Sequence, residues 1–554
     1  MACMKKIGCL LLLCNACVGP MASADNYSNH WVWIFGWNLK TDGDVVEITK
    51  VLESGAAHGI NGAVISCGLD SLSTMTADFS RRLDKVQRTC ERLKIELIPA
   101  GFGVGYGGTA LSHDKYLAEG LPVVDAPFLV QGRSARLVPD AQAHISNGGF
   151  EEFRGNRFNG FKFNDQPGEI SFADTEVKHS GQASLRMENF IANPHGHGRV
   201  MQEVRVLPHR CYRVSVWVKT ENLQPAGAFA ISVLNQDRSI ASLRSSVPPT
   251  GDWKKIQFLF NSASFDVVRL YAGVWGGKSG KFWLDDWALE EVGPINVLRR
   301  PGTPVAVKSA DGATTYAEGR DYEPLIDPAY TPYYIDRSAP SLKLSPGSRL
   351  QEGERLRVSW YHSLAINNGQ VSLCMAEPEL YEIFDAEAKL LAERLHPKHV
   401  LLNMDEIRMG GTCAACRGRN LGELLGECIT KQAQVLRKYM PGVEFLIWSD
   451  MLDPNQNAHG NYFLVDGDYT NSWKHIPKDM TIAVWGDKPR AESLKFFADQ
   501  GFAMLVACYY DADDLKDVKG WLKLADQTPK VRGLMYTPWQ KKYELLPAFG
   551  DLVK

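Results

Sequence analysis

Two adjacent carboxylates end one of the apolar runs of this chain. The segment HVLLNMDE (399–406) is a predicted buried strand that ends on Asp405 and Glu406. Like charges side by side raise each other's pKa and cost stability, so such a pair needs a reason. Two carboxyl groups can act as acid, base or nucleophile in the hydrolysis of a glycosidic bond. We therefore take Asp405 and Glu406 as candidate catalytic residues, with a solvated surface turn as the alternative.

Aromatic and acidic side chains also end the apolar runs that follow this pair. Aromatic rings offer flat apolar faces that stack on the C–H faces of sugars, while carboxylates accept hydrogen bonds from sugar hydroxyls. The candidate substrate-binding residues are Trp448, Asp450, Trp485, Tyr509, Tyr510, Asp511 and Trp539. Two alternatives stay open, because tryptophans also fill the interior of barrels and Asp450 could instead cap a helix.

The apolar runs alternate with stretches at helical spacing near both ends of the chain. Three runs precede residue 140, at 30–37, 62–68 and 95–102, and five follow residue 378. Such alternation is typical of parallel βα units, and eight strands complete a barrel whose active site lies at the C-terminal strand ends. We therefore expect an α/β fold, a (β/α)8 TIM barrel. A doubly wound sheet is the alternative, but no helix pattern follows the glycine-rich segment 103–108 as a dinucleotide site requires.

An all-β segment interrupts this barrel after its third strand. From about residue 145 to 292, short alternating runs are separated by Gly, Pro and Asn turns, which predicts a sandwich of jelly-roll type. The β pattern continues to about residue 363, which predicts a small β appendage. The expected domains are a signal peptide (1–24), the first part of the barrel (25–140), the jelly roll (141–293), the appendage (294–365) and the second part of the barrel (366–554).

Five motifs follow one another in the second half of the chain. They are the Asp-Glu pair, LIWSD, AVWG, YYD and TPW, on the expected fourth to eighth strands. In this order they resemble the family 20 glycoside hydrolases and related barrel hexosaminidases. The resemblance implies that the 2-acetamido oxygen of the substrate attacks, Glu406 protonates the leaving oxygen and Asp405 orients the amide. It also implies further contacts to the acetamido group and the sugar from Tyr509 or Tyr510, Trp448, Trp485 and Trp539.

Four motifs in the inserted segment point to a second kind of glycan contact. NGGFEE, HSGQASLRM, TGDWKK and KFWLDDWALEE resemble the carbohydrate-binding jelly rolls of secreted glycosidases. The resemblance implies glycan binding, with Trp275 as an aromatic candidate, or a packing domain as the alternative. It also implies a structural calcium ion, because hard carboxylate oxygens suit that ion. The candidate ligands are Glu151 or Glu152, and Asp285 or Asp286. No cofactor is expected for catalysis.

The composition is that of an ordinary soluble globular protein. Hydrophobic residues make up 45%, charged residues 23%, and the net charge is −3. The chain has no basic stripe, so we expect no nucleic acid as a partner. The partners that the resemblances above imply are glycans.

The N-terminus has the pattern of an export signal. Lys5 and Lys6 precede a short apolar stretch, and cleavage is expected after Ala24. The mature chain is therefore expected to be periplasmic or secreted, with a lipid anchor on Cys14 or Cys17 as the alternative. No later stretch is apolar for long enough to span a membrane.

The one close cysteine pair is Cys413-Ala-Ala-Cys416. A zinc site would call for a second such pair, and only Cys428 lies near. We therefore expect a loop disulfide or free thiols at Cys413 and Cys416 rather than a metal.

Together these patterns predict an exported glycoside hydrolase similar to β-N-acetylhexosaminidases. It would remove terminal N-acetylhexosamine from glycans, with Glu406 as general acid. Two alternatives stay open. One is a catalytically silent glycan-binding protein on a barrel scaffold, and the other is a glycosidase with a different carboxylate pair, such as Glu406 with Asp511.

Overall fold

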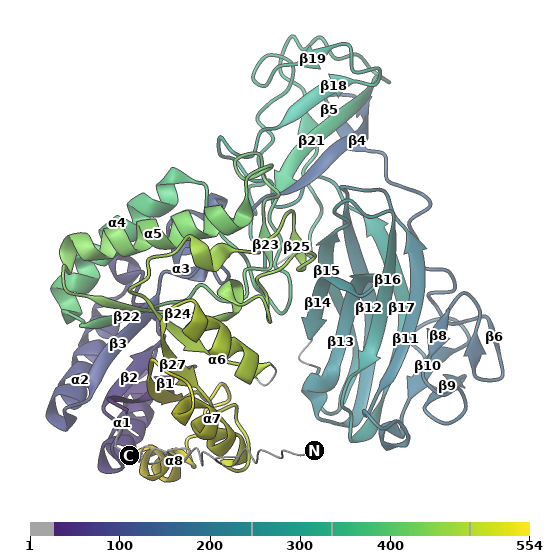
Figure 1. Ribbon diagram of the computed structural model, residues 1–554. Helices are drawn as coiled ribbons and strands as arrows, with labels where there is room; N and C mark the ends of the chain where they lie inside the picture. The colour runs from purple at the N-terminus through teal and green to yellow at the C-terminus, as the bar shows by residue number, and fades with distance from the viewer. Residues whose placement is uncertain (1–26, 245–246, 334–335, 487–488) are drawn as a thin grey trace, which may run out of the picture.

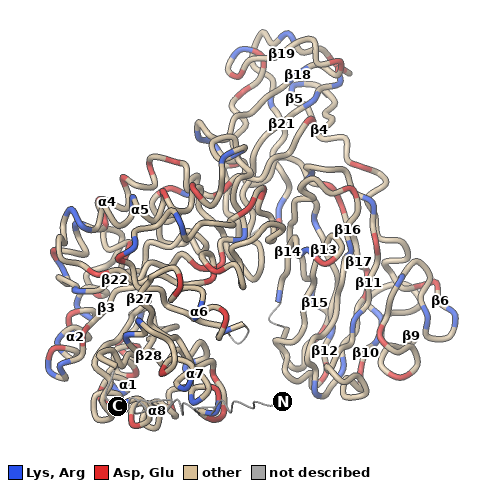
Figure 2. Tube along the Cα trace, viewed as in Figure 1, with Lys and Arg blue, Asp and Glu red and all other residues tan. Residues whose placement is uncertain are grey.

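A computed structural model describes residues 27–244, 247–333, 336–486 and 489–554, so the predicted signal peptide (1–24) lies outside the described residues. Figure 1 shows three parts: a barrel with helices around it, a β-sandwich beside it and a smaller sheet at the top of the view. In Figure 2, Lys and Arg are interspersed with Asp and Glu over all three parts. Within the described ranges, no helix is both long and apolar enough to cross a membrane.

Eight strands form a closed barrel in which every neighbouring pair is parallel. In order around the barrel they are β1 (Asn29–Ile34), β2 (Gly62–Ile65), β3 (Glu96–Gly101), β22 (His399–Leu402), β24 (Glu444–Trp448), β26 (Thr481–Val484), β27 (Ala503–Ala507) and β28 (Val531–Tyr536). Side chains such as Val64, Leu401 and Leu446 fill the interior, while alternate residues pack outward against helices. Because both faces are buried, the strands are continuous apolar runs in the sequence.

The prediction of a complete (β/α)8 TIM barrel is wrong, because the layer of helices around the strands is incomplete. The described α-helices are α1 (Asp42–Ala57), α2 (Ala77–Leu93), α3 (Gly108–His113), α4 (Pro378–Leu395), α5 (Leu421–Tyr439), α6 (Arg490–Asp499), α7 (Lys516–Asp526) and α8 (Leu546–Val553). Between β24 and β26, a stretch described throughout, there is no α-helix. Two short 3₁₀ helices, η6 (Asp450–Leu452) and η7 (Ser472–Lys474), and strand β25 (Leu464–Val465) make this connection. Its sequence DPNQNAHGN (453–461) is rich in Asp, Asn, Pro and Gly, which favour turns over a helix.

Helix α5 shows how the sequence sets the elements next to the carboxylate pair. The Asn420 side chain accepts a hydrogen bond from the Glu423 N–H (3.1 Å) and so caps the helix. Leu424, Leu425 and Ile429 are buried on its inner face, at the spacing of an amphipathic helix. The cap and this face fix where the loop before α5 must end.

The inserted sandwich consists of two five-stranded antiparallel sheets. One has the order β15 (Gly251–Asn261), β12 (Cys211–Gln224), β17 (Ser279–Glu291), β10 (Ser184–Met187) and β9 (Ser171–Asp174), and the other β14 (Arg238–Arg244), β13 (Phe229–Asn235), β16 (Val267–Val274), β11 (Gly198–Arg205) and β8 (Phe163–Asn164). A short hairpin, β6 (Phe153–Arg154) and β7 (Arg157–Phe158), lies beside them. Alternate side chains such as Val214, Val216 and Leu270 are fully buried in one cluster. The predicted jelly-roll-like sandwich is therefore present.

The third sheet joins two segments that the sandwich separates in the sequence. Its order is β19 (Thr315–Tyr316), β18 (Ala306–Ser309), β21 (Arg355–His362), β4 (Leu121–Gln131), β5 (Ser134–Leu137) and β20 (Leu342–Lys343). Strands β4 and β5 lie in the range 25–140 that we assigned to the barrel, so the insertion begins near residue 120 instead. The sequence does not reveal this, because β4 pairs with β21 more than 200 residues later. A two-stranded pair, β23 (Met409–Gly410) with β25, completes the sheets.

Candidate functional site

A cavity of about 430 Å³ lies at the C-terminal ends of the barrel strands. Its aromatic lining consists of Trp33, Phe35, Tyr106, Trp448, Trp485 and Trp539. Its polar lining includes Asp70, Asn403, Asp405 and Glu406. Five of the nine predicted catalytic and substrate-binding residues therefore share one cavity: Asp405, Glu406, Trp448, Trp485 and Trp539. Its volume is in the range of small-ligand sites.

The tryptophans form a connected wall. The ring centroids of Trp33 lie 5.5 Å from those of Trp448 and 5.7 Å from those of Trp539. Trp33 and Trp448 are only 2% and 3% exposed, so their rings belong to the barrel interior as well as to the cavity. Trp485 and Trp539 are partly exposed. These last two rings present more open surface for stacking on a ligand.

The carboxylate pair lies where β22 breaks into its loop. The strand ends at Leu402, and Glu406 adopts the left-handed conformation with φ 49°. Successive residues of a regular strand point to opposite faces, so only such a break lets Asp405 and Glu406 both line the cavity. The Glu406 N–H donates to the Asp450 carboxylate (2.8 Å), which holds the break in place.

The Glu406 carboxylate contacts a tyrosine hydroxyl and an arginine guanidinium. The Tyr106 hydroxyl donates to one carboxylate oxygen (2.5 Å), and the Arg408 guanidinium pairs with the other (2.6 Å). Arg408 is itself buried and also donates to the Gln370 side chain (2.6 Å). Both contacts stabilise the negative charge of Glu406 and fix the direction of its carboxylate.

Asp405 and Asp450 retain protons more tightly than ordinary carboxyl groups. Burial, followed by the charges of Asp450 and Glu406, raises the pKa of Asp405 to about 8. Burial raises the pKa of Asp450 to about 6, against hydrogen bonds from the Glu406 backbone and other donors. At neutral pH Asp405 therefore keeps its proton while Asp450 is mostly ionised, and a carboxyl group that keeps its proton is what acid catalysis requires.

Asp450 lies behind the cavity lining and contacts residues that line the cavity. It is fully buried, and its oxygens accept hydrogen bonds from Asn457 (2.8 Å) and from the Trp485 indole N–H (3.2 Å). Asp450 is not among the lining residues, so it orients Trp485 and the Glu406 backbone. It also makes no capping hydrogen bond, which removes the helix-cap alternative.

The seventh-strand residues lie outside the cavity lining. The Tyr509 ring stacks on Tyr536 (centroids 4.0 Å apart) and its hydroxyl donates to the Ala512 carbonyl (2.8 Å). The Tyr510 hydroxyl accepts from the Gly486 N–H (2.8 Å). The Asp511 carboxylate accepts from the backbone N–H groups of Trp539 (2.9 Å) and Gln540 (3.0 Å). In this structure these side chains position neighbouring loops.

Several lining residues were not predicted from the sequence. Asp70, 4% exposed, accepts hydrogen bonds from the Phe102 N–H (2.5 Å) and the Thr109 hydroxyl (3.0 Å), and burial raises its pKa. Asn403 accepts from the Trp448 indole N–H (3.1 Å). Tyr106 lies in the glycine-rich segment 103–108. These residues lie in loops, where no periodicity marks them.

The glycine-rich segment has a packing role. A Cβ on Gly105 would lie 2.1 Å from the Asp405 carbonyl oxygen, and one on Gly103 would lie 2.8 Å from that of Asn403. Glycine therefore lets the loop after β3 pass directly beside the carboxylate loop. This contact delivers Tyr106 to Glu406.

The predicted calcium ligands gather around one loop of the sandwich. Asp285 accepts from the backbone N–H groups of His179 (2.8 Å) and Ser180 (3.2 Å). Asp286 contacts the His179 ring (2.6 Å), and Glu151 accepts from the Gln182 N–H (2.7 Å). Glu152 contacts Asn159 instead (3.5 Å). Within the described residues these four do not meet as a metal-binding group, and the calcium ion stays a prediction.

The sandwich carries its own pocket, of about 330 Å³. Trp275 lines it together with Arg244 and the hydroxyl side chains of Ser232 and Ser242. An indole ring beside polar groups is a lining that suits a sugar.

Comparison with known proteins bears on this inserted part. Residues 142–278 match the family model CBM_4_9, a carbohydrate binding domain. Similar solved structures include TmCBM61 in complex with beta-1,4-galactotriose, at 18% identity over 27% of this chain and 98% of that chain (TM-score 0.20). They also include the CBM22-1 xylan-binding domain of Paenibacillus barcinonensis Xyn10C (16% identity, 28% and 95% covered, TM-score 0.19) and a cyclase from Fischerella sp. TAU (14%, 26% and 94%, TM-score 0.22). No curated protein sequence matches the chain. The family match identifies residues 142–278 as a carbohydrate-binding domain of the CBM4/9 family.

Proposed function

We propose that the protein is a glycoside hydrolase whose barrel cavity cleaves terminal N-acetylhexosamine from glycans that the sandwich helps to bind. The observation that carries the proposal is the aromatic cavity in which Asp405, with its raised pKa, lies beside Glu406. In the substrate-assisted route the 2-acetamido oxygen attacks the anomeric carbon, so no second protein carboxylate is needed as nucleophile. Glu406 would protonate the leaving oxygen, and Asp405 would orient the acetamido group.

The alternative pair of Glu406 with Asp511 has less support. Both backbone contacts of Asp511 are to the loop that carries Trp539, and Asp511 is not among the residues that line the cavity. A nucleophile must reach the anomeric carbon, whereas this carboxylate is committed to holding a loop.

One observation favours an exchange of roles within the pair. Glu406 is ion-paired with Arg408, while burial and neighbouring charge keep a proton on Asp405. In this second candidate mechanism Asp405 is the proton donor and Glu406 stabilises positive charge that develops on the sugar.

Leaving-group dependence separates the two assignments. We expect the wild-type protein to hydrolyse aryl N-acetylglucosaminides or N-acetylgalactosaminides. Replacing the general acid lowers kcat/KM by about 10²–10⁴-fold for phenyl glycosides, but much less for dinitrophenyl glycosides, whose leaving group needs no proton. Replacing the carboxylate that does not donate the proton lowers both rates alike. Glu406→Gln and Asp405→Asn therefore give opposite patterns under the two assignments.

The control is Asp453→Asn, because Asp453 is a buried aspartate of the neighbouring connection after β24 and does not line the cavity. It should retain nearly full activity. If the wild-type protein hydrolyses no member of a broad aryl-glycoside panel, the hydrolase proposal is wrong and only glycan binding remains.

A further inference from the structure

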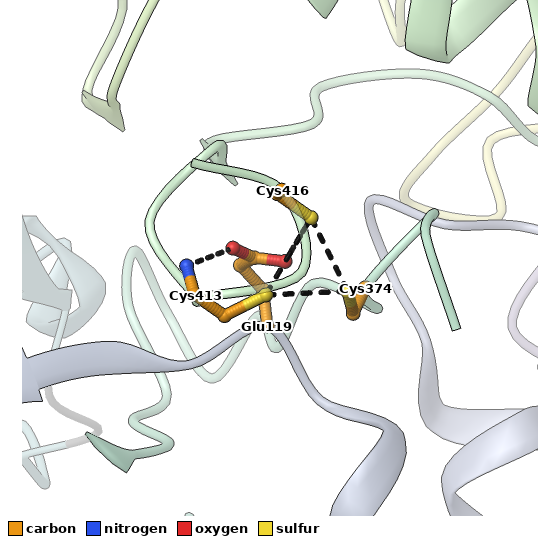
Figure 3. A group of neighbouring side chains, drawn as sticks. All are labelled: Glu119, Cys374, Cys413 and Cys416. Carbon is orange, nitrogen blue, oxygen red and sulfur yellow. Dashed lines mark hydrogen bonds between the residues drawn. The ribbon is translucent and has the colours of Figure 1, made fainter. Parts of the chain in front are cut away.

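Three cysteines and a glutamate that are distant in the sequence meet in the interior. Figure 3 shows the side chains of Glu119, Cys374, Cys413 and Cys416 facing one another. Each is at most 1% exposed, and their sulfur atoms and a carboxylate oxygen all lie within 4.8 Å of one another. In the described part of the chain, no other group of His, Cys, Asp and Glu side chains meets this criterion.

The sulfur atoms are spaced for a shared ligand rather than for a disulfide. Cys374 Sγ lies 3.4 Å from Cys413 Sγ and 3.3 Å from Cys416 Sγ, and the latter two are 3.5 Å apart. A disulfide bond measures about 2.05 Å. A tetrahedral zinc ion with bonds of about 2.3 Å to sulfur and about 2.0 Å to oxygen separates two sulfurs by about 3.8 Å, and sulfur from oxygen by about 3.5 Å. The sulfurs need to move apart by only a few tenths of an ångström to reach this geometry.

Glu119 is oriented as a metal ligand would be. Its Oε1 accepts hydrogen bonds from the Thr412 N–H (3.0 Å), the Thr412 hydroxyl (2.9 Å) and the Cys413 N–H (2.9 Å). Its Oε2 points instead at the Cys416 sulfur, 3.5 Å away. Outer hydrogen bonds of this kind fix the direction of a ligating carboxylate, and here they leave one oxygen for an ion.

A buried cation lies beside the cluster. Three thiolates, one carboxylate and a divalent ion leave two negative charges, which are costly away from water. The Arg300 guanidinium is buried beside the cluster, where it also forms an ion pair with Glu377. It is held there by the carbonyls of Tyr116 (2.8 Å) and Ala118 (3.0 Å).

We propose that Glu119, Cys374, Cys413 and Cys416 bind a structural Zn²⁺ ion. Three soft thiolates and one carboxylate close a four-coordinate site with no open position, which is the arrangement of structural rather than catalytic zinc. Glu119 lies where the chain leaves the barrel for the insertion, and Cys374 where it returns before α4. Cys413 and Cys416 lie in the loop that begins with Asp405 and Glu406. The ion fastens both ends of the insertion to the loop that carries the carboxylate pair.

The sequence favoured a disulfide or free thiols at Cys413 and Cys416 because no second cysteine pair lies nearby. The structure supplies the remaining ligands from other segments, Cys374 at a separation of 39 residues and Glu119 at 294. Cys413 and Cys416 are free thiols in the structure, which is one of the two predicted alternatives, and the proposed zinc ion goes beyond that prediction.

Metal analysis of the whole protein, purified without added metal or chelator, tests the proposal. We expect about one zinc ion per chain by plasma mass spectrometry, and three sulfur ligands with one oxygen by X-ray absorption at the zinc edge. Cys416→Ala and Cys374→Ala should lose the zinc. Cys90→Ala, which removes an equally buried thiol on α2, should retain it.

Cobalt substitution tests the ligand set without relying on the cysteine variants, which could fail to fold. The cobalt protein should show a thiolate charge-transfer band and the intense visible bands of a tetrahedral site. Glu119→Gln should keep the charge-transfer band and shift the visible bands, because only the oxygen ligand changes. The proposal is overturned if the reduced wild-type protein takes up neither zinc nor cobalt, or if mass spectrometry finds a Cys413–Cys416 disulfide in the protein as isolated.

Discussion

Removal of the buried charge of Asp450 should shift the pH dependence of the barrel site. Asp450 lies under the carboxylate pair, and its charge is the second cause, after burial, of the raised pKa of Asp405. Asp450→Asn keeps the shape and an acceptor oxygen for the Glu406 N–H or the Trp485 indole, but it removes the charge. The substitution therefore separates electrostatics from packing.

The direction and size of the shift follow from the structure. The pKa of Asp405 is raised from 3.8 to about 8 in the folded protein. A neighbouring charge in such a site changes a pKa by about 1 to 3 units. Without the like charge, Asp405 ionises more readily and loses its proton at lower pH. If catalysis requires the proton on Asp405, kcat/KM falls on the alkaline side near pH 8. In Asp450→Asn the pH of this fall should therefore be lower by about 1 to 3 units.

The pH dependence of the free energy of unfolding should show the same change in the pKa of Asp405, without an activity assay. Because the folded state binds the Asp405 proton more tightly than the unfolded chain, the contribution of Asp405 to the free energy of unfolding falls as the pH rises from about 4 to about 8. Asp450→Asn should flatten this fall by about 1.4 kcal/mol for each unit by which the pKa of Asp405 drops, and it also removes the contribution of the raised pKa of Asp450 itself, which lies between pH 4 and 6. Urea unfolding at a series of pH values measures it.

Asp453→Asn is the matched control for both measurements. Asp453 is equally buried in the same loop, and its pKa is also raised by burial, but it is not a cause of the shift at Asp405. An alkaline limb that stays in place in Asp450→Asn, or moves by the same amount in Asp453→Asn, would refute the reasoning.

Three further substitutions test the barrel cavity and the sandwich pocket that we propose as glycan sites. Gly105→Ala places a Cβ within 2.1 Å of the Asp405 carbonyl oxygen, so we expect about 1–3 kcal/mol of destabilisation in thermal melts and an activity loss of about 100-fold. In the control Gly108→Ala the Cβ meets nothing within 4 Å, so stability and activity should not change. Asp511→Ala frees the Trp539 backbone and should raise KM about tenfold with a smaller change in kcat, and an unchanged KM would contradict this positioning role. Trp275→Ala should weaken retention on glycan affinity gels about tenfold while kcat/KM on aryl glycosides stays at the wild-type value, and equal retention would exclude this pocket.

The barrel strands and the carboxylate pair could be predicted because they depend on local signals. Continuous apolar runs mark strands that are buried on both faces, and the Asp405-Glu406 pair stands out at the end of one of them. Side-chain direction could not be predicted in the same way. Tyr509 and Asp511 end the seventh strand as expected, yet packing against Tyr536 and the Trp539 loop turns them away from the cavity lining.

Pairing between strands that are distant in the sequence is the main reason why the predicted fold differs from the observed one. Strand β4 reads as part of the barrel in sequence order, but its partner β21 lies beyond the entire sandwich. The absence of an α-helix between β24 and β26 has a local cause, because the turn-forming composition of 453–461 disfavours a helix. This feature is visible in the sequence. Tyr106 and Asp70 were missed because loop residues carry no periodic pattern.

The insertion affects the site through the two chain segments that connect it to the barrel. At its start, the Glu119 N–H donates to the Ser372 carbonyl (2.8 Å), and at its end the Cys374 N–H donates to Leu117 (2.9 Å), so the two connecting segments run side by side. Glu119 then holds Thr412 and Cys413 in the loop that starts at the carboxylate pair, while Gln370 donates to the Glu406 carbonyl (2.6 Å) and accepts from Arg408. Arg408 in turn pairs with Glu406. The segments that connect the sandwich to the barrel therefore also contact the carboxylate loop, and a rearrangement of either segment would reach Glu406 through these contacts.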